Sequence, residues 1–168
     1  MSLRRMTAAW ILAIALAAAA GCTAGASREG DAMRKLTWKL AKTATQAKEL
    51  EVAAAIPAEW ASEVTQSPDG MLLSCGDSEY TWNGATSVTL VAGADPESAV
   101  RAVEAHYQGQ PFEVRTRKNI VNKYEVQLIA ADSGENYIIA EGQPGTIRIA
   151  SGSPCFALPE GTYPGGAW

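Results

Sequence analysis

The spacing of hydrophobic positions changes near residue 22. Residues 6–20 form an uninterrupted apolar run, whereas apolar residues from 31 to 56 recur every three or four positions. That spacing is typical of a helix with one buried stripe. We therefore expect an amphipathic helix over 31–56, capped by Asp31 and ended by Pro57. Its buried stripe is expected to consist of Met33, Leu36, Leu40, Ala44, Ala47, Leu50 and Ala54.

Turn-forming residues separate β-rich runs after this helix. Residues 67–70, Ser-Pro-Asp-Gly, fit a type I turn, and strands are expected over 71–75, 79–82 and 85–91. Asn83-Gly84 lies between the last two runs. This pair is either the turn of a hairpin or a bulge in one long strand.

A second helix and a meander are predicted for the rest of the chain. Asp95, Pro96 and Glu97 are an N-cap, a first-turn proline and a first-turn acid, and Gly109 ends the helix. Alternating patterns over 112–117, 124–129, 137–139 and 147–149 predict strands joined by short turns, hence antiparallel neighbours. The fold class is therefore α+β, an antiparallel sheet of about five to seven strands with two helices packed on one face. One domain is expected over 31–160, and a loose tail over 161–168.

The N-terminal segment is typical of an export signal. Arg4 and Arg5 precede a 15-residue apolar run, which is shorter than a membrane-spanning helix. The small residues before Cys22 resemble the bacterial lipobox, a resemblance that implies cleavage before the cysteine and a diacylated thiol. Residues 1–21 are then a signal peptide, and 22–30 are the lipidated cysteine and a linker. The expected location is the extracytoplasmic face of the cell membrane, because two acyl chains anchor stably. In one alternative, ordinary cleavage after Ala26 releases the protein; in another, the segment stays as an uncleaved anchor.

Two further cysteines, Cys75 and Cys155, are expected to form a disulfide. Export places them in an oxidising compartment, and Cys22 is taken by lipid. Closing a loop of about 80 residues stabilises a fold by roughly 4 kcal/mol. Two cysteines and the distant His106 do not make a metal ligand set, so no metal is expected.

Charge is unevenly distributed along the chain. Residues 22–48 hold six basic and two acidic residues, a net +4, whereas residues 49–168 hold six basic and sixteen acidic residues, a net −10. The acidic part disfavours nucleic-acid binding. Lys35, Lys39 and Lys42 follow the anchor and are expected to contact anionic lipid head groups.

The chain carries no nucleotide-binding, hydrolase or metalloprotease motif. We therefore expect a non-catalytic interaction domain without a cofactor. The alternative is a hydrolase whose carboxylates meet only in the fold. If the helices cover one sheet face, the other face is expected to dock an envelope protein or an acidic polymer. The residues expected there are Arg115, Arg117, Lys123 and Arg148.

Four features together resemble the small LppA-type lipoproteins of high-GC Gram-positive bacteria. They are the Ala-rich signal ending at Cys22, the helix over 31–56, Leu-Leu-Ser-Cys-Gly at 72–76, and Ser-Pro-Cys-Phe at 153–156. That group has no established activity. The resemblance therefore implies an envelope location and a disulfide-bearing domain, and it assigns no site residues.

Overall fold

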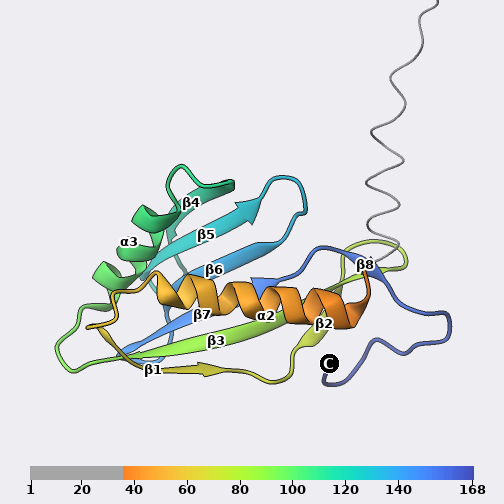
Figure 1. The fold of residues 1–168 in the computed structure, drawn as a ribbon, viewed down its shortest axis with the longest axis horizontal. Coiled ribbons are helices and arrows are strands. Elements are labelled where there is room, and N and C mark those ends of the chain that lie inside the picture. Colours follow the sequence, from red (N-terminus) through yellow and green to blue (C-terminus); the bar gives the residue numbers. More distant parts are fainter. Residues whose placement is uncertain (1–35) are drawn as a thin grey trace, which may run out of the picture.

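The computed structural model describes residues 36–168; the expected signal peptide, Cys22, the expected linker, Asp31 and Lys35 lie outside them. The described chain is an antiparallel sheet with two helices (Figure 1). The helices are α2 (Trp38–Ala54) and α3 (Pro96–Tyr107). The strands are β1 (Ala61–Gln66), β2 (Met71–Ser74), β3 (Glu79–Leu90), β4 (Phe112–Lys118), β5 (Tyr124–Ala130), β6 (Asn136–Glu141), β7 (Thr146–Gly152) and β8 (Phe156–Ala157). The predicted α+β class is confirmed.

The sheet has eight strands, one more than the upper end of the expected range. Six follow the order β1-β3-β7-β6-β5-β4, while β2 and β8 pair with β3 beyond the ends of β1 and β7. β3 is therefore the longest strand, because four others pair with it. The meander from β4 to β7 matches the expectation from the alternating pattern.

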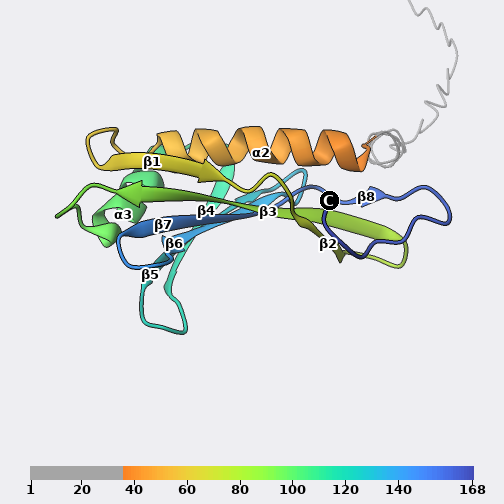
Figure 2. The same cartoon turned by 90° about the horizontal axis from the view of Figure 1, so that it is seen from below.

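Both helices pack on one sheet face and share a hydrophobic core with it. Val52 of α2 and Val103 of α3 are fully buried in the same cluster as strand residues such as Val126, Ile139 and Ile149. Val126, Ile139 and Ile149 are direct cross-strand partners, so their side chains point to the same side. Figure 2 shows α2 lying along this side of the sheet.

The first helix differs from its prediction in its start and in its buried face. It begins at Trp38, where the Thr37 hydroxyl accepts a hydrogen bond from the Leu40 amide. Two members of the expected stripe, Leu40 and Leu50, are 58% and 45% accessible, whereas Leu36 is partly buried against Ala41, Trp82 and Phe156. Met33 lies outside the described residues. The buried face consists of Ala41, Thr45, Glu49, Val52 and Ala53. Hydrophobicity alone gave the wrong face because the sheet presents polar partners to Glu49.

β3 passes through Asn83-Gly84 as one long strand, so the hairpin interpretation is wrong, and the expected alternative of one long strand holds without its bulge. Asn83, Gly84 and Ala85 pair in unbroken register with β7. The indole of the buried Trp82 lies where a side chain on residue 84 would be. Gly84 is therefore required by a close approach within a strand, not by a turn.

Trp168 departs from the loose tail expected for 161–168. Its backbone pairs with Gly70 through two hydrogen bonds of 3.1 and 2.9 Å. Its ring meets Trp38 edge to face at 5.2 Å between centroids. The backbone oxygen also accepts hydrogen bonds from Lys42 Nζ at 2.9 Å and Trp82 Nε1 at 3.1 Å. This residue thus joins α2 to the start of β2.

The predicted disulfide between Cys75 and Cys155 is present, with the two Cα atoms 6.4 Å apart. Cys75 follows β2, and Cys155 precedes β8. Because β2 and β8 both pair with the first half of β3, the bond holds the two outer partners of that half together.

Candidate binding site at the β4–β5 hairpin

The turn between β4 and β5 displays two adjacent apolar side chains. Ile120 is fully exposed, and Val121 is 66% exposed. The hairpin projects away from the rest of the sheet (Figure 2). Neither side chain joins the two core clusters of the described residues. Both side chains therefore lie in solvent and take no part in the hydrophobic core.

Hydrogen bonds from Asn119 order this turn. Its side-chain oxygen accepts from the amides of Val121 at 3.1 Å and Lys123 at 3.0 Å. Its backbone nitrogen donates to Lys123 O at 2.9 Å, and its backbone oxygen accepts from Asn122 N at 2.9 Å. Asn122 has φ = 61°, a left-handed conformation that asparagine tolerates better than most residues. The apolar pair is therefore presented by a defined loop.

Basic residues gather on the same hairpin. Four of the six basic residues after position 48 lie on it: Arg115, Arg117, Lys118 and Lys123. Each pairs with a carboxylate: Arg115 with Glu113, Arg117 with Glu125, Lys118 with Glu97 and Lys123 with Glu141, at 2.7, 2.6, 3.0 and 2.5 Å. The basic side chains are 49–65% exposed. Glu113 and Glu97 are also exposed, and exposed ion pairs contribute only about 0–1 kcal/mol, so Arg115 and Lys118 can exchange partners. The carboxylates of Glu125 and Glu141 are only 9% and 16% exposed.

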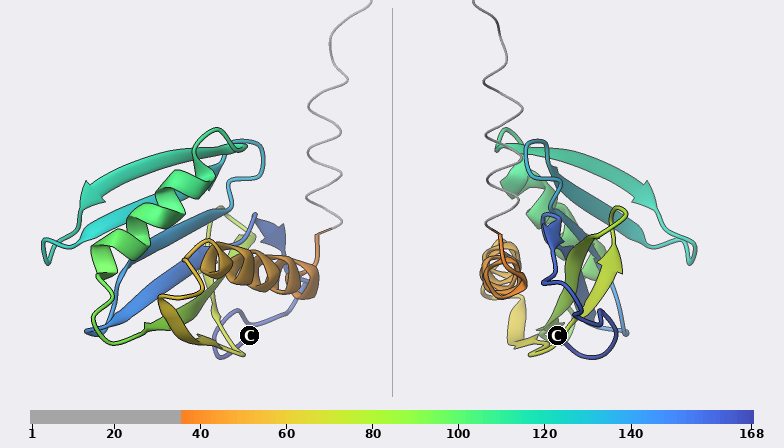
Figure 3. Two further views of the ribbon diagram at one scale, coloured as in Figure 1. Left: turned by 60° about the vertical axis from the view of Figure 1, so that its left-hand side comes forward. Right: turned by 90° about the vertical axis from the view of Figure 1, so that its right-hand side faces the viewer.

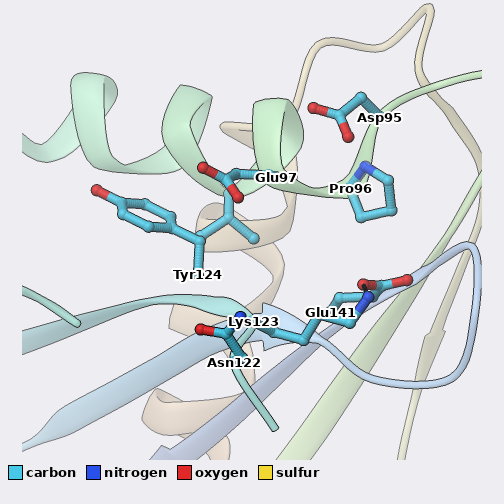
Figure 4. Close-up of a pocket in the computed structure, with 8 residues that line it drawn as sticks. Asp95, Pro96, Glu97, Asn122, Lys123, Tyr124 and Glu141 are labelled. Carbon is cyan, nitrogen blue, oxygen red and sulfur yellow. Dashed lines mark ion pairs between the residues drawn. The ribbon is translucent and has the colours of Figure 1, made fainter. Parts of the chain in front are cut away.

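A hollow of about 310 Å³ lies between the β4–β5 turn and the start of α3 (Figure 4). Its charged lining consists of Asp95, Glu97, Lys123 and Glu141. Hydrogen bonds from the Ser98 hydroxyl and amide lower the pKa of Asp95, the N-cap of α3. Hydrogen bonds from Lys118 and Arg101 lower the pKa of Glu97. Both shifts favour the ionised carboxylate, which suits binding a cation rather than donating a proton.

An aromatic side chain connects the hairpin to α3. The Tyr124 hydroxyl donates to Glu104 Oε2 at 2.6 Å, and the Arg101 guanidinium lies 3.9 Å from the centroid of its ring. Lys118 also reaches the Glu97 carboxylate on α3. These contacts hold the strand ends that flank the turn against the helix, while Ile120 and Val121 stay exposed.

The residues of the predicted basic face separate into two groups. Arg117, Glu125, Ala140 and Arg148 are successive cross-strand partners, so Arg117 and Arg148 point to the sheet face opposite the helices. Arg115 shares that face by its spacing of two from Arg117. Lys123 instead bonds Glu141 and lines the hollow. The structure therefore brings together three of the four.

The described lysines expected at the membrane also differ from each other. Lys39 is exposed. Lys42 turns toward the body of the domain, where Nζ bonds the Trp168 backbone oxygen and lies 3.5 Å from Asp69 Oδ1. Its side chain is only 18% exposed. Of these two, Lys39 alone is placed to meet an external surface.

Glu49 is buried, and its side chain is hydrogen-bonded to other side chains inside the fold. It accepts hydrogen bonds from Thr86 Oγ1 at 2.7 Å, Gln66 Nε2 at 2.8 Å and the Ser151 hydroxyl. Its accessibility is zero, so it cannot touch a substrate in this conformation. Within residues 36–168, no group of three His, Cys, Asp or Glu side chains is arranged to hold a metal ion.

Sequence reasoning named three of the four basic residues of the hairpin, and it missed Lys118 and the apolar tip. The signal was the string Lys-Asn-Ile-Val-Asn-Lys at 118–123, in which two β-branched apolar residues occupy a turn between lysines. Turns are normally polar, so an apolar pair at such a position is a candidate contact.

Comparisons with known proteins provide little beyond this geometry. No protein-family model and no curated protein matches the chain. Among solved structures, the chain is similar to LppA from Mycobacterium tuberculosis, provisionally classed as a lipoprotein, at 19% identity and a TM-score of 0.41. The match covers 83% of this chain and 96% of that one. No conclusion about this chain rests on a likeness of that size.

The two described helices are also informative about membrane crossing. Neither α2 nor α3 combines the length and the apolar composition that a helix needs to pass through a bilayer.

Proposed function

We propose that this protein is an exported lipoprotein, held at the extracytoplasmic face of the cell membrane by lipid on Cys22, whose folded domain is a non-catalytic interaction module. The observation that carries the proposal is the Cys75–Cys155 disulfide. Disulfides persist in oxidising compartments and are rare in the cytosol. Such a bond supports export, which is what the N-terminal signal predicts.

The anchor is supported by the sequence around Cys22. Small residues precede the cysteine, and an apolar run with two leading arginines precedes them. A diacylated cysteine supplies two acyl chains, which is enough for stable anchoring. The partner of the displayed domain is an envelope protein or an acidic polymer, and the face with Arg115, Arg117 and Arg148 is one place for it to dock.

Replacing the anchor residue tests the location. Cys22→Ala should abolish lipidation, so that uncut precursor accumulates or unlipidated product appears in the medium. Cell fractionation and intact mass measure both outcomes. Ser27→Ala serves as the matched control and should change neither, because it leaves the cysteine in place.

One result would reject the anchor. If the Cys22→Ala protein fractionates as before and its mature N-terminus is residue 27 in both proteins, the chain is cut after Ala26 and carries no lipid. Hydrolysis of an envelope substrate by the purified protein, lost on changing one acid, would reject the non-catalytic part separately.

A further inference from the structure

We propose that the β4–β5 hairpin is a second membrane contact, in which Ile120 and Val121 enter the boundary between head groups and acyl chains of an anionic bilayer. The basic residues beside them then meet lipid phosphates. The proposal rests on the proposed function for bringing the domain to a membrane. Its chemistry depends only on the hairpin, so the two can fail separately.

The apolar pair fits a lipid surface because of how it is displayed. Ile120 and Val121 are neighbours at an ordered tip, and the Asn119 hydrogen bonds keep them pointing outward. An ordered tip loses little conformational freedom when it inserts. Burying two β-branched side chains in an apolar medium is favourable in proportion to the area removed from water.

Charge favours an anionic surface over a neutral one. Residues 49–168 carry a net charge of −10, so most of the domain is repelled by anionic lipid. The stretch 114–124 is the exception, with four basic residues and no acidic one. Two of their ion pairs, Arg115–Glu113 and Lys118–Glu97, are exposed at both ends, so lipid phosphates can replace those carboxylates at small cost. The carboxylates paired with Arg117 and Lys123 are only 9% and 16% exposed. Lys118 and Lys123 flank the turn that carries Ile120 and Val121, so these two cations and the apolar tip lie at the same end of the hairpin.

The shape of the molecule makes the tip accessible to a flat surface. The hairpin projects beyond the sheet, so its tip can meet a bilayer before the body does (Figure 2). The start of α2, where the chain enters the described domain, lies at the other end of the molecule from this hairpin (Figure 3). An anchor before α2 and a contact at the tip would therefore hold the domain lengthwise along the membrane.

The exposed stripe of α2 is the competing surface, and it fits less well. Its larger side chains, Leu40 and Leu50, are separated by nearly three helical turns of small residues. Among the lysines of α2, Lys39 is exposed, Lys42 turns toward Trp168, and Lys48 pairs with Glu51. This surface provides the matched controls for the test.

The test uses the chain from residue 23 onward, exported behind an ordinary signal so that no lipid is attached. Co-sedimentation with phosphatidylglycerol-containing vesicles at low salt should show binding that neutral phosphatidylcholine vesicles do not. Ile120→Ser with Val121→Ser should weaken it by about tenfold or more. Leu40→Ser with Leu50→Ser should leave it unchanged.

Charge reversal separates the two basic regions. Lys118→Glu with Lys123→Glu should weaken binding to anionic vesicles and reduce its salt dependence, whereas Lys39→Glu should not. Circular dichroism and the intact mass of the disulfide form confirm that each variant is folded. The four altered hairpin residues are exposed, so loss of binding without loss of structure supports the proposal.

Three outcomes would overturn it. They are no binding to anionic vesicles at low salt, binding that survives the change of the tip, and equal loss in the α2 control. If the tip captures an envelope protein while vesicles are ignored, the hairpin is a protein-docking site instead. Because the tested chain lacks lipid, none of these results depends on whether Cys22 is acylated.

Discussion

At the scale of single residues, Glu49 shows how a buried polar side chain is accommodated. It lies on the inner face of α2, and none of its hydrogen-bond partners is cationic. Two hydroxyls and one amide donate to the carboxylate instead. Burying a polar group is costly unless it is hydrogen-bonded, and here three donors from β1, β3 and β7 contact the carboxyl group. This polar contact fixes the rotation of α2 on the sheet.

Removing this carboxylate should destabilise the fold. Glu49→Ala leaves the Thr86 and Ser151 hydroxyls without their acceptor, which should lower the free energy of unfolding by about 3 kcal/mol. Glu49→Gln should cost less, because the amide oxygen still accepts. Urea unfolding midpoints measure the difference. The exposed neighbour Glu51 is the control, and Glu51→Ala should change stability by no more than about 0.5 kcal/mol.

The same residue explains why the helix face was predicted wrongly. Counting apolar residues selects Leu40 and Leu50 for the core and places Glu49 outside. The partners that admit Glu49, Thr86 and Ser151, are distant in sequence and become visible only when β3 and β7 pair. The hairpin tip is the opposite case, since Ile120 and Val121 stand in a local turn pattern that could have been recognised from sequence.

At the scale of elements, the sequence correctly predicted the helices and strands whose boundaries depend on neighbouring residues. The cap, proline and acid at 95–97 mark α3, and alternation with short turns marks β4 to β7. β1 and β8 were not anticipated, because both form by pairing with β3 rather than by a pattern of their own. Asn83-Gly84 resembles a turn, but pairing on both sides keeps β3 straight through it.

The position of the C-terminal tail also depends on tertiary contacts that the sequence pattern does not reveal. Trp168→Ala removes the edge-to-face contact with Trp38 and should lower stability by about 1–2 kcal/mol. Hydrogen exchange should also become faster at the Gly70 amide, which donates to the Trp168 backbone. Tyr163→Ala is the control within the same tail, because its side chain is exposed and the change should be near neutral. Equal effects of both changes would show that the tail is not held through Trp168.

At the scale of the whole molecule, the disulfide closes the end of the sheet that has the shortest strands. Alkylation of the native protein without reductant should leave Cys75 and Cys155 unmodified by mass. Replacing either cysteine should lower the free energy of unfolding by about 2–5 kcal/mol, because the unfolded chain loses a long closed loop, and should expose the other as a free thiol. Labelling of both cysteines in the folded protein would show that the bond is absent.

The central position of β3 has a consequence for the order of folding. Its partners come from both sides of it in the chain: β1 and β2 precede it, while β7 and β8 are the last strands. Such high contact order slows folding, because distant segments must meet before native pairing stabilises them. A chain threaded through a membrane from its N-terminus delivers α2 early and β7 late. Glu49 and Cys75 would then lack their partners Ser151 and Cys155 until late in export. The domain could therefore complete its fold only after nearly all of the chain had crossed.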